Sequence, residues 1–239
     1  MNLEEFSKEF RLQADRMGLQ ITDVQIEKFF KYKNLLLEWN EKINLTAITD
    51  EKEIIVKHFI DSILVSTHIK NEATVIDVGT GAGFPGIPLK IYDESIKLTL
   101  LDSLNKRTVF LQEVVDSLDL KDVTVIHSRA EDGAQDRKYR ETFDYAISRA
   151  VAPLNVLLEY LVPYVKVNGN IIAMKGSNAN EEIVISRNAI EKLNVEITEK
   201  EKISLPNDAG DRFTIILNKK KPTNKIYPRK AGTPKKNPL

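Results

Sequence analysis

The chain has 239 residues, of which 42% are hydrophobic and 29% are charged, a composition typical of a soluble globular protein with one large α/β domain and a smaller addition. It contains no cysteine, which excludes disulfides, thiolate metal sites and cysteine nucleophiles. No apolar run approaches the roughly 20 residues of a membrane span, and Met1–Phe10 carries acids rather than an apolar signal core, so we expect a cytoplasmic protein.

Positive charge gathers at the C-terminal end, although the formal net charge is zero. Residues 219–239 contain eight Lys or Arg and no acid, whereas the rest of the chain has 27 basic and 35 acidic residues. A basic tail on an acidic body suits a polyanionic partner. The same composition is equally typical of a solvated tail without a partner.

Three helical segments are predicted in the N-terminal part of the chain. Apolar residues of the first repeat every three or four positions, as one helix face requires. The pairs Thr22 with Gln25 and Asp50 with Glu53 are expected to begin the second and third helices. We therefore predict a helical cap over residues 1–70.

Strands and helices are predicted to alternate after this cap. Short apolar runs indicate strands, and amphipathic stretches between them indicate helices. The expected strands lie at residues 74–78, 98–101, 123–126, 143–147 and 170–174. The expected helices cover residues 105–118 and a stretch that starts at Pro153, a residue favoured at the first helical position.

The end of the fold has a different pattern. Residues 195–205 keep a period of two, residues 206–211 are typical of a turn, and residues 213–217 predict a closing strand. Two strands joined without a helix indicate an antiparallel pair at one sheet edge. We therefore predict an α/β fold, with a mostly parallel doubly wound sheet over residues 71–220 and a basic C-terminal tail at 221–239.

Glycines follow the first predicted strand at positions 79, 81 and 83. A buried parallel strand that ends in glycines lets the backbone approach a ligand, and ligands bind at the carboxyl ends of such strands. A phosphate loop is excluded because no Gly-Lys-Ser or Gly-Lys-Thr follows. Gly81–Gly86 matches the dinucleotide pattern G-x-G-x-x-G, but a fingerprint that starts directly after the strand begins at Gly79 and places Phe84 where a small residue is needed.

A third interpretation needs no pyrophosphate. Asp77-x-Gly79-x-Gly81-x-Gly83, with an acid at the end of the next strand, resembles Rossmann-like S-adenosylmethionine methyltransferases. Asp102 lies 23 residues after Gly79, where a carboxylate would accept both ribose hydroxyls. Alternatively, Asp102 caps the helix that begins near Asn105.

Further motifs along almost the whole chain resemble one family, the bacterial 16S ribosomal RNA guanine-N7 methyltransferases, also called glucose-inhibited division protein B. The motifs are residues 39–46 (Trp-Asn-Glu-Lys-Ile-Asn-Leu-Thr), His58-Phe59-x-x-Asp61-Ser62, residues 77–86, Asp102-Ser103, Arg129-Ala130-Glu131, Ser148-Arg149-Ala150 and Tyr227-Pro228-Arg229-Lys230-x-Gly232-Thr233-Pro234. The resemblance implies a class I methyltransferase fold with a seven-stranded sheet.

The resemblance and the strand-end pattern together give a set of expected contacts to S-adenosyl-L-methionine. These are Gly79, Gly81, Gly83, Phe84, Asp102, Ser103, Ala130, Glu131 and Arg149. Glu131 is expected near the adenine, and Phe84 is a candidate to stack on the target base. Arg149 would meet the cofactor carboxylate or an RNA phosphate; alternatively it pairs with a local acid such as Asp144.

The resemblance also implies the reaction and its partners. Guanine N7 has a lone pair and no proton, so we expect no catalytic acid or base and a positioning role for Arg149. The expected partner is 16S ribosomal RNA or the small ribosomal subunit, contacted by the tail and by Arg129, Arg149 and Lys175. We expect no metal, because the three histidines lack metal-ligand spacing. We also expect a monomer.

Two alternatives stay open on the sequence alone. A nicotinamide-dependent oxidoreductase would need a hydride-transfer constellation, and the sequence has no Tyr-x-x-x-Lys pair and no placed His-Asp pair. An RNA-binding or ribosome-assembly protein would use the fold only as a scaffold, since phosphate contacts alone hold RNA.

Overall fold

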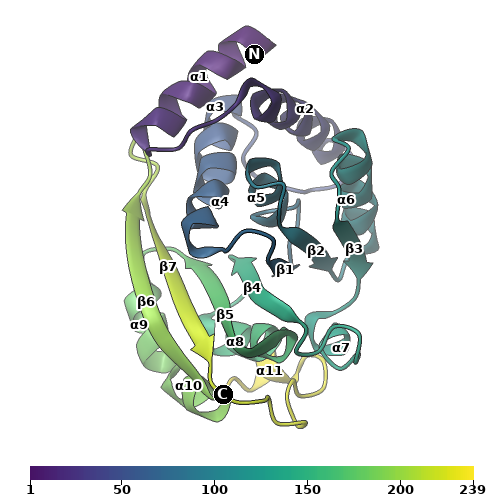
Figure 1. Ribbon diagram of the computed structural model, residues 1–239, viewed down its shortest axis with the longest axis vertical. Coiled ribbons are helices and arrows are strands. Elements are labelled where there is room, and N and C mark those ends of the chain that lie inside the picture. The colour runs from purple at the N-terminus through teal and green to yellow at the C-terminus, as the bar shows by residue number, and fades with distance from the viewer.

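A computed structural model describes all residues from 1 to 239, and its centre is one seven-stranded sheet (Figure 1). The strand order is β3-β2-β1-β4-β5-β7-β6. The strands are β1 (Thr74–Val78), β2 (Lys97–Asp102), β3 (Val123–His127), β4 (Phe143–Arg149), β5 (Val165–Lys175), β6 (Val195–Ser204) and β7 (Asp211–Lys219). The first five run parallel, whereas β7 pairs antiparallel with both β5 and β6. This confirms the predicted Rossmann-like α/β fold, its seven strands and the antiparallel edge pair.

Helices cover both faces of the sheet. The α-helices are α1 (Leu3–Arg16), α2 (Asp23–Asn40), α3 (Glu51–Ile54), α4 (Asp61–Ile63), α5 (Gly86–Tyr92), α6 (Asn105–Ser117), α7 (Ala130–Gly133), α8 (Leu154–Leu161), α9 (Ala179–Ile185), α10 (Arg187–Lys192) and α11 (Thr233–Lys236). Three short helices of other types are present: a π-helix, η1 (Ile55–Ile60), and two 3₁₀-helices, η2 (Leu64–His68) and η3 (Val162–Tyr164). None of these helices is long and apolar enough to cross a membrane.

The N-terminal helices begin where their caps predict. Thr22 and Gln25 form a capping box at α2, and the Asp50 carboxylate accepts the Glu53 N–H at 2.9 Å at the start of α3. The third predicted helix is not a regular α-helix throughout, because α3 continues into the π-helix η1 before α4 begins. Pro153 lies one residue earlier than expected, as the N-cap of α8.

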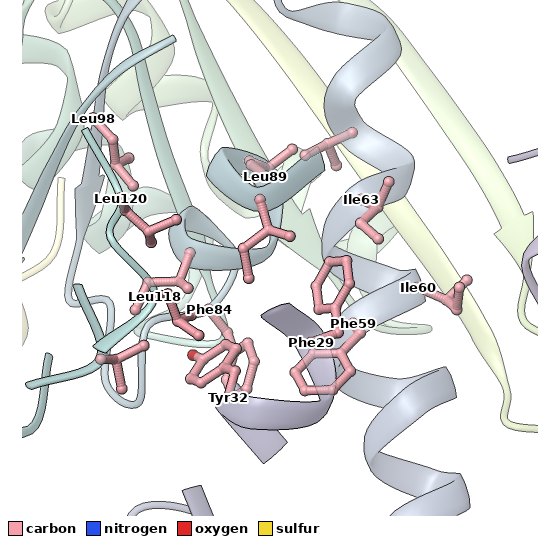
Figure 2. Packing of buried hydrophobic residues seen from close by; sticks show 14 of the residues in the cluster. Phe29, Tyr32, Phe59, Ile60, Ile63, Phe84, Leu89, Leu98, Leu118 and Leu120 are labelled. Atoms are coloured by element: carbon pink, nitrogen blue, oxygen red, sulfur yellow. The ribbon is translucent and has the colours of Figure 1, made fainter. Parts of the chain in front are cut away.

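Side chains from the two sheet faces form two hydrophobic cores, as the alternation along each strand requires. On one face, the N-terminal helices, α5 and α6 share a cluster of 36 buried residues with the sheet. Figure 2 shows its aromatic centre, where Phe29 packs against Phe59, and Tyr32 and Phe59 both pack against Phe84. On the other face, α8 packs with residues of α9 and α10 into a second cluster of 23 buried residues. Residues 1–70 therefore share a continuous core with the sheet.

The basic C-terminal segment is folded against the protein. Arg229 forms a bidentate ion pair with Glu159 of α8, whose side chain is fully buried. Lys219 is also fully buried and pairs with Glu141, which in turn accepts the Thr223 N–H at 2.7 Å. These contacts hold the segment beside α7 and α8, at the bottom of Figure 1.

Candidate functional site

The loop after β1 leaves room for a ligand at the carboxyl edge of the sheet. Gly79 and Gly81 have φ values of 72° and 62°, a left-handed conformation that favours glycine. A Cβ on Gly79 would lie 2.7 Å from a Val151 methyl group, whereas a Cβ on Gly81 would project into open space. The Gly79 N–H donates to the Leu101 carbonyl at 2.8 Å, which holds the loop over the end of β2.

Asp102 ends β2 directly beside this loop. Its carboxylate is 2% exposed and accepts two backbone hydrogen bonds, from Gly81 N–H and Leu104 N–H, both at 2.9 Å. Arg107 of α6 lies 3.5 Å from the same carboxylate. Leu104 is the N-cap residue of α6, so Asp102 stabilises the turn that starts this helix and also stands at the rim of the loop.

A cavity of about 480 Å³ lies between this loop, the end of β2 and the loop after β4. We call it the glycine-loop cavity, and its size is within the usual range for small-molecule sites. It brings together six of the predicted contact residues: Gly79, Gly81, Phe84, Asp102, Ser103 and Arg149. Its remaining lining residues are Leu45, Thr46, His58, Thr80, Ala82, Leu104, Arg107, Ala150 and Val151.

Three predicted contact residues lie outside this lining. Gly83 (φ 97°) faces the core, where a Cβ would come within 2.6 Å of the Tyr32 hydroxyl oxygen. The Ala130 carbonyl accepts a 2.7 Å hydrogen bond from Tyr164, and the buried Glu131 carboxylate accepts the Gly232 N–H at 2.8 Å. The start of α7 is thus connected to η3 through Ala130 and to the C-terminal segment through Glu131.

Arg149, at the end of β4, is fixed by the N-terminal part of the chain. Its guanidinium pairs with the Asp61 carboxylate at 2.9 Å, and donates to the Lys57 carbonyl at 3.0 Å. It does not pair with Asp144, which accepts hydrogen bonds from Thr74 instead. Arg149 therefore forms an ion pair within the protein, as the alternative interpretation expected, but its partner is Asp61, 88 residues earlier in the chain, and not Asp144.

His58 joins this cluster as a neutral ring. One ring nitrogen lies 3.1 Å from an Arg149 nitrogen and the other 2.9 Å from the Thr46 hydroxyl. Burial and the neighbouring Arg149 charge lower the pKa of His58 to about 3, so the ring accepts the hydrogen bond from Arg149 at neutral pH. The ring also stacks on Phe84 with 4.4 Å between centroids.

Phe84 is packed rather than presented to a ligand. It is 6% exposed and packs beside Tyr32 (Figure 2). His58 stacks on the ring, and the Arg149 guanidinium lies 4.9 Å from its centroid. The ring therefore has no open face for a target base. It forms part of the cavity wall and supports Arg149 through a cation–π contact.

Asp77 is buried beneath the glycine loop with one carboxylate oxygen unsatisfied. Its Oδ2 accepts hydrogen bonds from Thr80 and from Gly86 N–H, at 2.7 and 2.9 Å, whereas Oδ1 has no partner. Burial raises the pKa of Asp77 to about 7. Asp77 therefore holds the two ends of the loop together from below.

Sequence reasoning missed part of the cavity wall. Leu45 and Thr46 belong to a motif whose role the sequence does not reveal, and Val151 follows the Ser148–Ala150 motif directly. Ala150 has a φ of 56°, which a sequence pattern does not indicate for an alanine. The structure has no group of three or more His, Cys, Asp or Glu side chains arranged to hold a metal ion.

The seven-stranded sheet and its helices place this chain in the class of Rossmann-like methyltransferase folds. A solved S-adenosylmethionine-dependent methyltransferase from Aquifex aeolicus superposes with a TM-score of 0.55 and 19% identity, over 76% of this chain and 97% of the other. At this level of identity the likeness concerns the fold.

Sequence comparisons identify the family within this class. The family described as rRNA small subunit methyltransferase G matches residues 25–207. The ribosomal RNA small subunit methyltransferase G of Alkaliphilus metalliredigens is 52% identical over 95% of both chains, and that of Alkaliphilus oremlandii is 48% identical over the full length of both. The chain belongs to the rRNA small subunit methyltransferase G family. The resemblance inferred from the motifs is thereby confirmed.

Proposed function

We propose that this protein uses S-adenosyl-L-methionine to methylate N7 of a guanine in the 16S RNA of the small ribosomal subunit. Family membership over nearly the whole chain carries this proposal, and it makes the oxidoreductase and scaffold alternatives unnecessary. Such an enzyme would act in the cytoplasm, on free ribosomal RNA or on an assembling subunit.

The glycine-loop cavity supports a role for its residues in binding the cofactor. A buried carboxylate at the rim, Asp102, suits a pair of ribose hydroxyls, because each carboxylate oxygen retains a lone pair beyond its backbone hydrogen bond. Open space over Gly81 suits the close approach of a ligand to the backbone. Ser103 and the walls at Gly79 and Phe84 complete the proposed contacts in this cavity.

Arg149 is proposed to position the reactants rather than to transfer protons. Contacts with Asp61, His58 and Phe84 fix its guanidinium, and the Arg149 side chain is 15% exposed. The remaining N–H capacity is available to a carboxylate or phosphate oxygen. Gly83, Ala130 and Glu131 are proposed to act indirectly, by fixing the glycine loop and the start of α7.

The chemistry requires alignment more than acid–base catalysis. When bound, S-adenosyl-L-methionine supplies a methyl group on a positively charged sulfur. Guanine N7 attacks without losing a proton, so the protein needs to hold the base in line and exclude water. No residue of the glycine-loop cavity is therefore assigned the role of a general base.

A methyl-transfer assay tests the proposal. Purified protein is incubated with radiolabelled S-adenosyl-L-methionine and either unmodified 16S RNA or small subunits that lack the modification. We expect label in the RNA of at least one substrate. Protein that binds RNA without transferring label would support the scaffold alternative and refute the enzymatic proposal.

A further inference from the structure

A second cavity adjoins the glycine-loop cavity and shares its wall. It has a volume of about 620 Å³, and four residues line both cavities: His58, Arg149, Ala150 and Val151. We call it the Glu182 cavity, after a glutamate of α9 in its lining. Its other walls come from the N-terminal segment, the start of α8, the end of β5 and β7.

The charged residues of the Glu182 cavity favour an RNA segment. Four cations line it, Lys57, Arg149, Lys175 and Arg212, against the two carboxylates Asp61 and Glu182. This excess of positive charge suits a nucleotide and its flanking phosphates. The cavity volume is within the range that accommodates one base with its sugar.

The two carboxylates differ in their remaining hydrogen-bonding capacity. Asp61 is 3% exposed, and both its oxygens face arginines, Arg149 at 2.9 Å and Arg212 at 3.5 Å. Glu182 uses only Oε2, which accepts the Leu154 N–H at 2.7 Å and lies 2.7 Å from Lys175 Nζ. Its Oε1 has no protein partner, and the side chain is 24% exposed. An ionised carboxylate has about four acceptor positions, so about two remain on Glu182.

Guanine is the one RNA base whose Watson–Crick edge presents two adjacent kinds of donor, N1–H and the N2 amino group. We propose that Glu182 recognises the target guanine by accepting hydrogen bonds from N1–H and N2–H, an inference that rests on the proposed function. Adenine offers no donor at either position and would leave Glu182 Oε1 without a hydrogen-bond partner, which is costly once the base has excluded water from the site.

The same arrangement orients the base for reaction. N7 lies on the edge of guanine opposite N1 and N2, so a base anchored at Glu182 extends N7 away from α9. The wall that both cavities share, formed by His58, Arg149, Ala150 and Val151, lies between them. Glu182 is held by the first turn of α8 and by the end of β5, so its position is set before RNA binds.

The test compares RNA that carries guanosine at the target position with RNA that carries inosine there. Inosine differs from guanosine only in lacking the N2 amino group. The methylated position is mapped first, and RNAs with guanosine or inosine there are then made by ligating a synthetic segment. We expect wild-type kcat/KM to be at least about tenfold lower on inosine, because inosine cannot donate the second hydrogen bond to the charged acceptor. In Glu182→Gln we expect kcat/KM on guanine to fall about 100-fold and the guanine-to-inosine ratio to approach one.

Exposed Glu181, the preceding residue of α9, provides the matched control. Glu181→Gln is expected to keep the wild-type ratio, and calorimetric binding of S-adenosyl-L-methionine to Glu182→Gln shows whether its fold is intact. If Glu182→Gln does not fold, Glu182→Asp replaces it, with a changed ratio expected.

Equal wild-type rates on guanine and inosine overturn the assignment whatever the variants do. An unchanged ratio in a folded Glu182 variant also overturns it, while leaving the methyltransferase function intact. Failure of the wild type to methylate either RNA refutes the proposed function itself, and the role of Glu182 with it.

Discussion

Asp102 is held in position before any ligand binds, because the N–H groups of Gly81 and Leu104 donate to its two oxygens. We predict that Asp102→Ala lowers the affinity for S-adenosyl-L-methionine about 10- to 100-fold, because hydrogen bonds to a charged group contribute about 1.5–3 kcal/mol. Isothermal calorimetry measures this change directly. The fold should persist, since water at the cavity rim can satisfy the two N–H groups.

Asp116→Ala on the exposed side of α6 controls for the removal of one negative charge. It is expected to bind the cofactor as the wild type does. Normal cofactor binding by Asp102→Ala would remove Asp102 from the site and leave it with the turn before α6 as its only role.

Asp77 links stability to pH with an unusual sign. Its pKa is about 7 in the folded protein, because burial disfavours the charge, and about 4 in the unfolded chain. The folded state therefore binds more protons than the unfolded state between about pH 4 and 7, and the contribution of Asp77 to stability falls as pH rises through that window. Asp77→Asn cannot ionise and does not lose stability in this way. We therefore predict that the free energy of unfolding of Asp77→Asn, relative to that of the wild type, increases by on the order of 2–4 kcal/mol from pH 4 to pH 8.

Urea unfolding of both proteins across this pH range measures the difference. Asp15→Asn, at an exposed position of α1, is the control for removal of an aspartate and should follow the wild-type pH profile. A constant stability difference between wild type and Asp77→Asn at every pH would contradict the prediction.

At the level of elements, the C-terminal segment serves both structure and charge. The buried carboxylates of Glu159 and Glu131 bind Arg229 and the Gly232 N–H, so deletion of residues 222–239 would remove the partners of both. Truncation would thus confuse a fall in stability with a fall in RNA binding, because an unpaired buried charge is strongly destabilising. A sharper experiment changes only the exposed lysines of the segment.

We predict that replacing Lys225, Lys230, Lys235 and Lys236 by Gln weakens RNA binding and lowers its salt dependence. These side chains are exposed and form no ion pair in the structure. Each phosphate that is no longer neutralised by a lysine should reduce the slope of log K against log salt by about 0.7–0.9. Filter binding at several salt concentrations gives the slope, and circular dichroism checks that the fold is unchanged.

The control is the same number of Lys-to-Gln changes at exposed positions of the N-terminal segment, Lys8, Lys31, Lys52 and Lys70. An equal effect of both sets on the salt slope would show that the tail has no special role. An unchanged slope in the tail variant would support the alternative of a solvated tail.

Much of the element order could be predicted because it depends on local patterns. The capping pairs at Thr22 and Asp50 and the apolar runs before Gly79 and Asp102 mark their elements directly. The π-helix η1 has no such sequence signal, because it differs from an α-helix only in its backbone hydrogen-bonding pattern. The packing of the tail was also hidden, because the Arg229–Glu159 pair joins residues 70 positions apart.

The candidate site was predictable where it follows the strand ends. Asp102, Arg149 and the glycine loop meet because parallel strands end at one edge of the sheet. The position of Glu182 could not be predicted in this way, because it lies on a helix and reaches its cavity through tertiary packing. The ion-pair partner of Arg149 could not be predicted either, since Asp61 comes from the N-terminal segment and not from a strand end.

On the scale of the whole molecule, the N-terminal segment completes both cavities. It shares one core with the sheet and supplies His58 to both linings, Thr46 to the glycine-loop cavity and Asp61 to the Glu182 cavity. Arg149 connects the two cavities through this segment. We propose that the methyl donor occupies one cavity and the target base the other, since direct methyl transfer requires two such neighbouring sites.

The product nucleoside gives the most direct test of this arrangement. Unmodified 16S RNA is treated with the protein and labelled S-adenosyl-L-methionine, digested to nucleosides and separated by chromatography with mass detection. We predict that the label elutes with 7-methylguanosine. Label in any other nucleoside would contradict the proposed reaction, and unlabelled RNA from both free 16S RNA and small subunits would contradict the proposed enzyme.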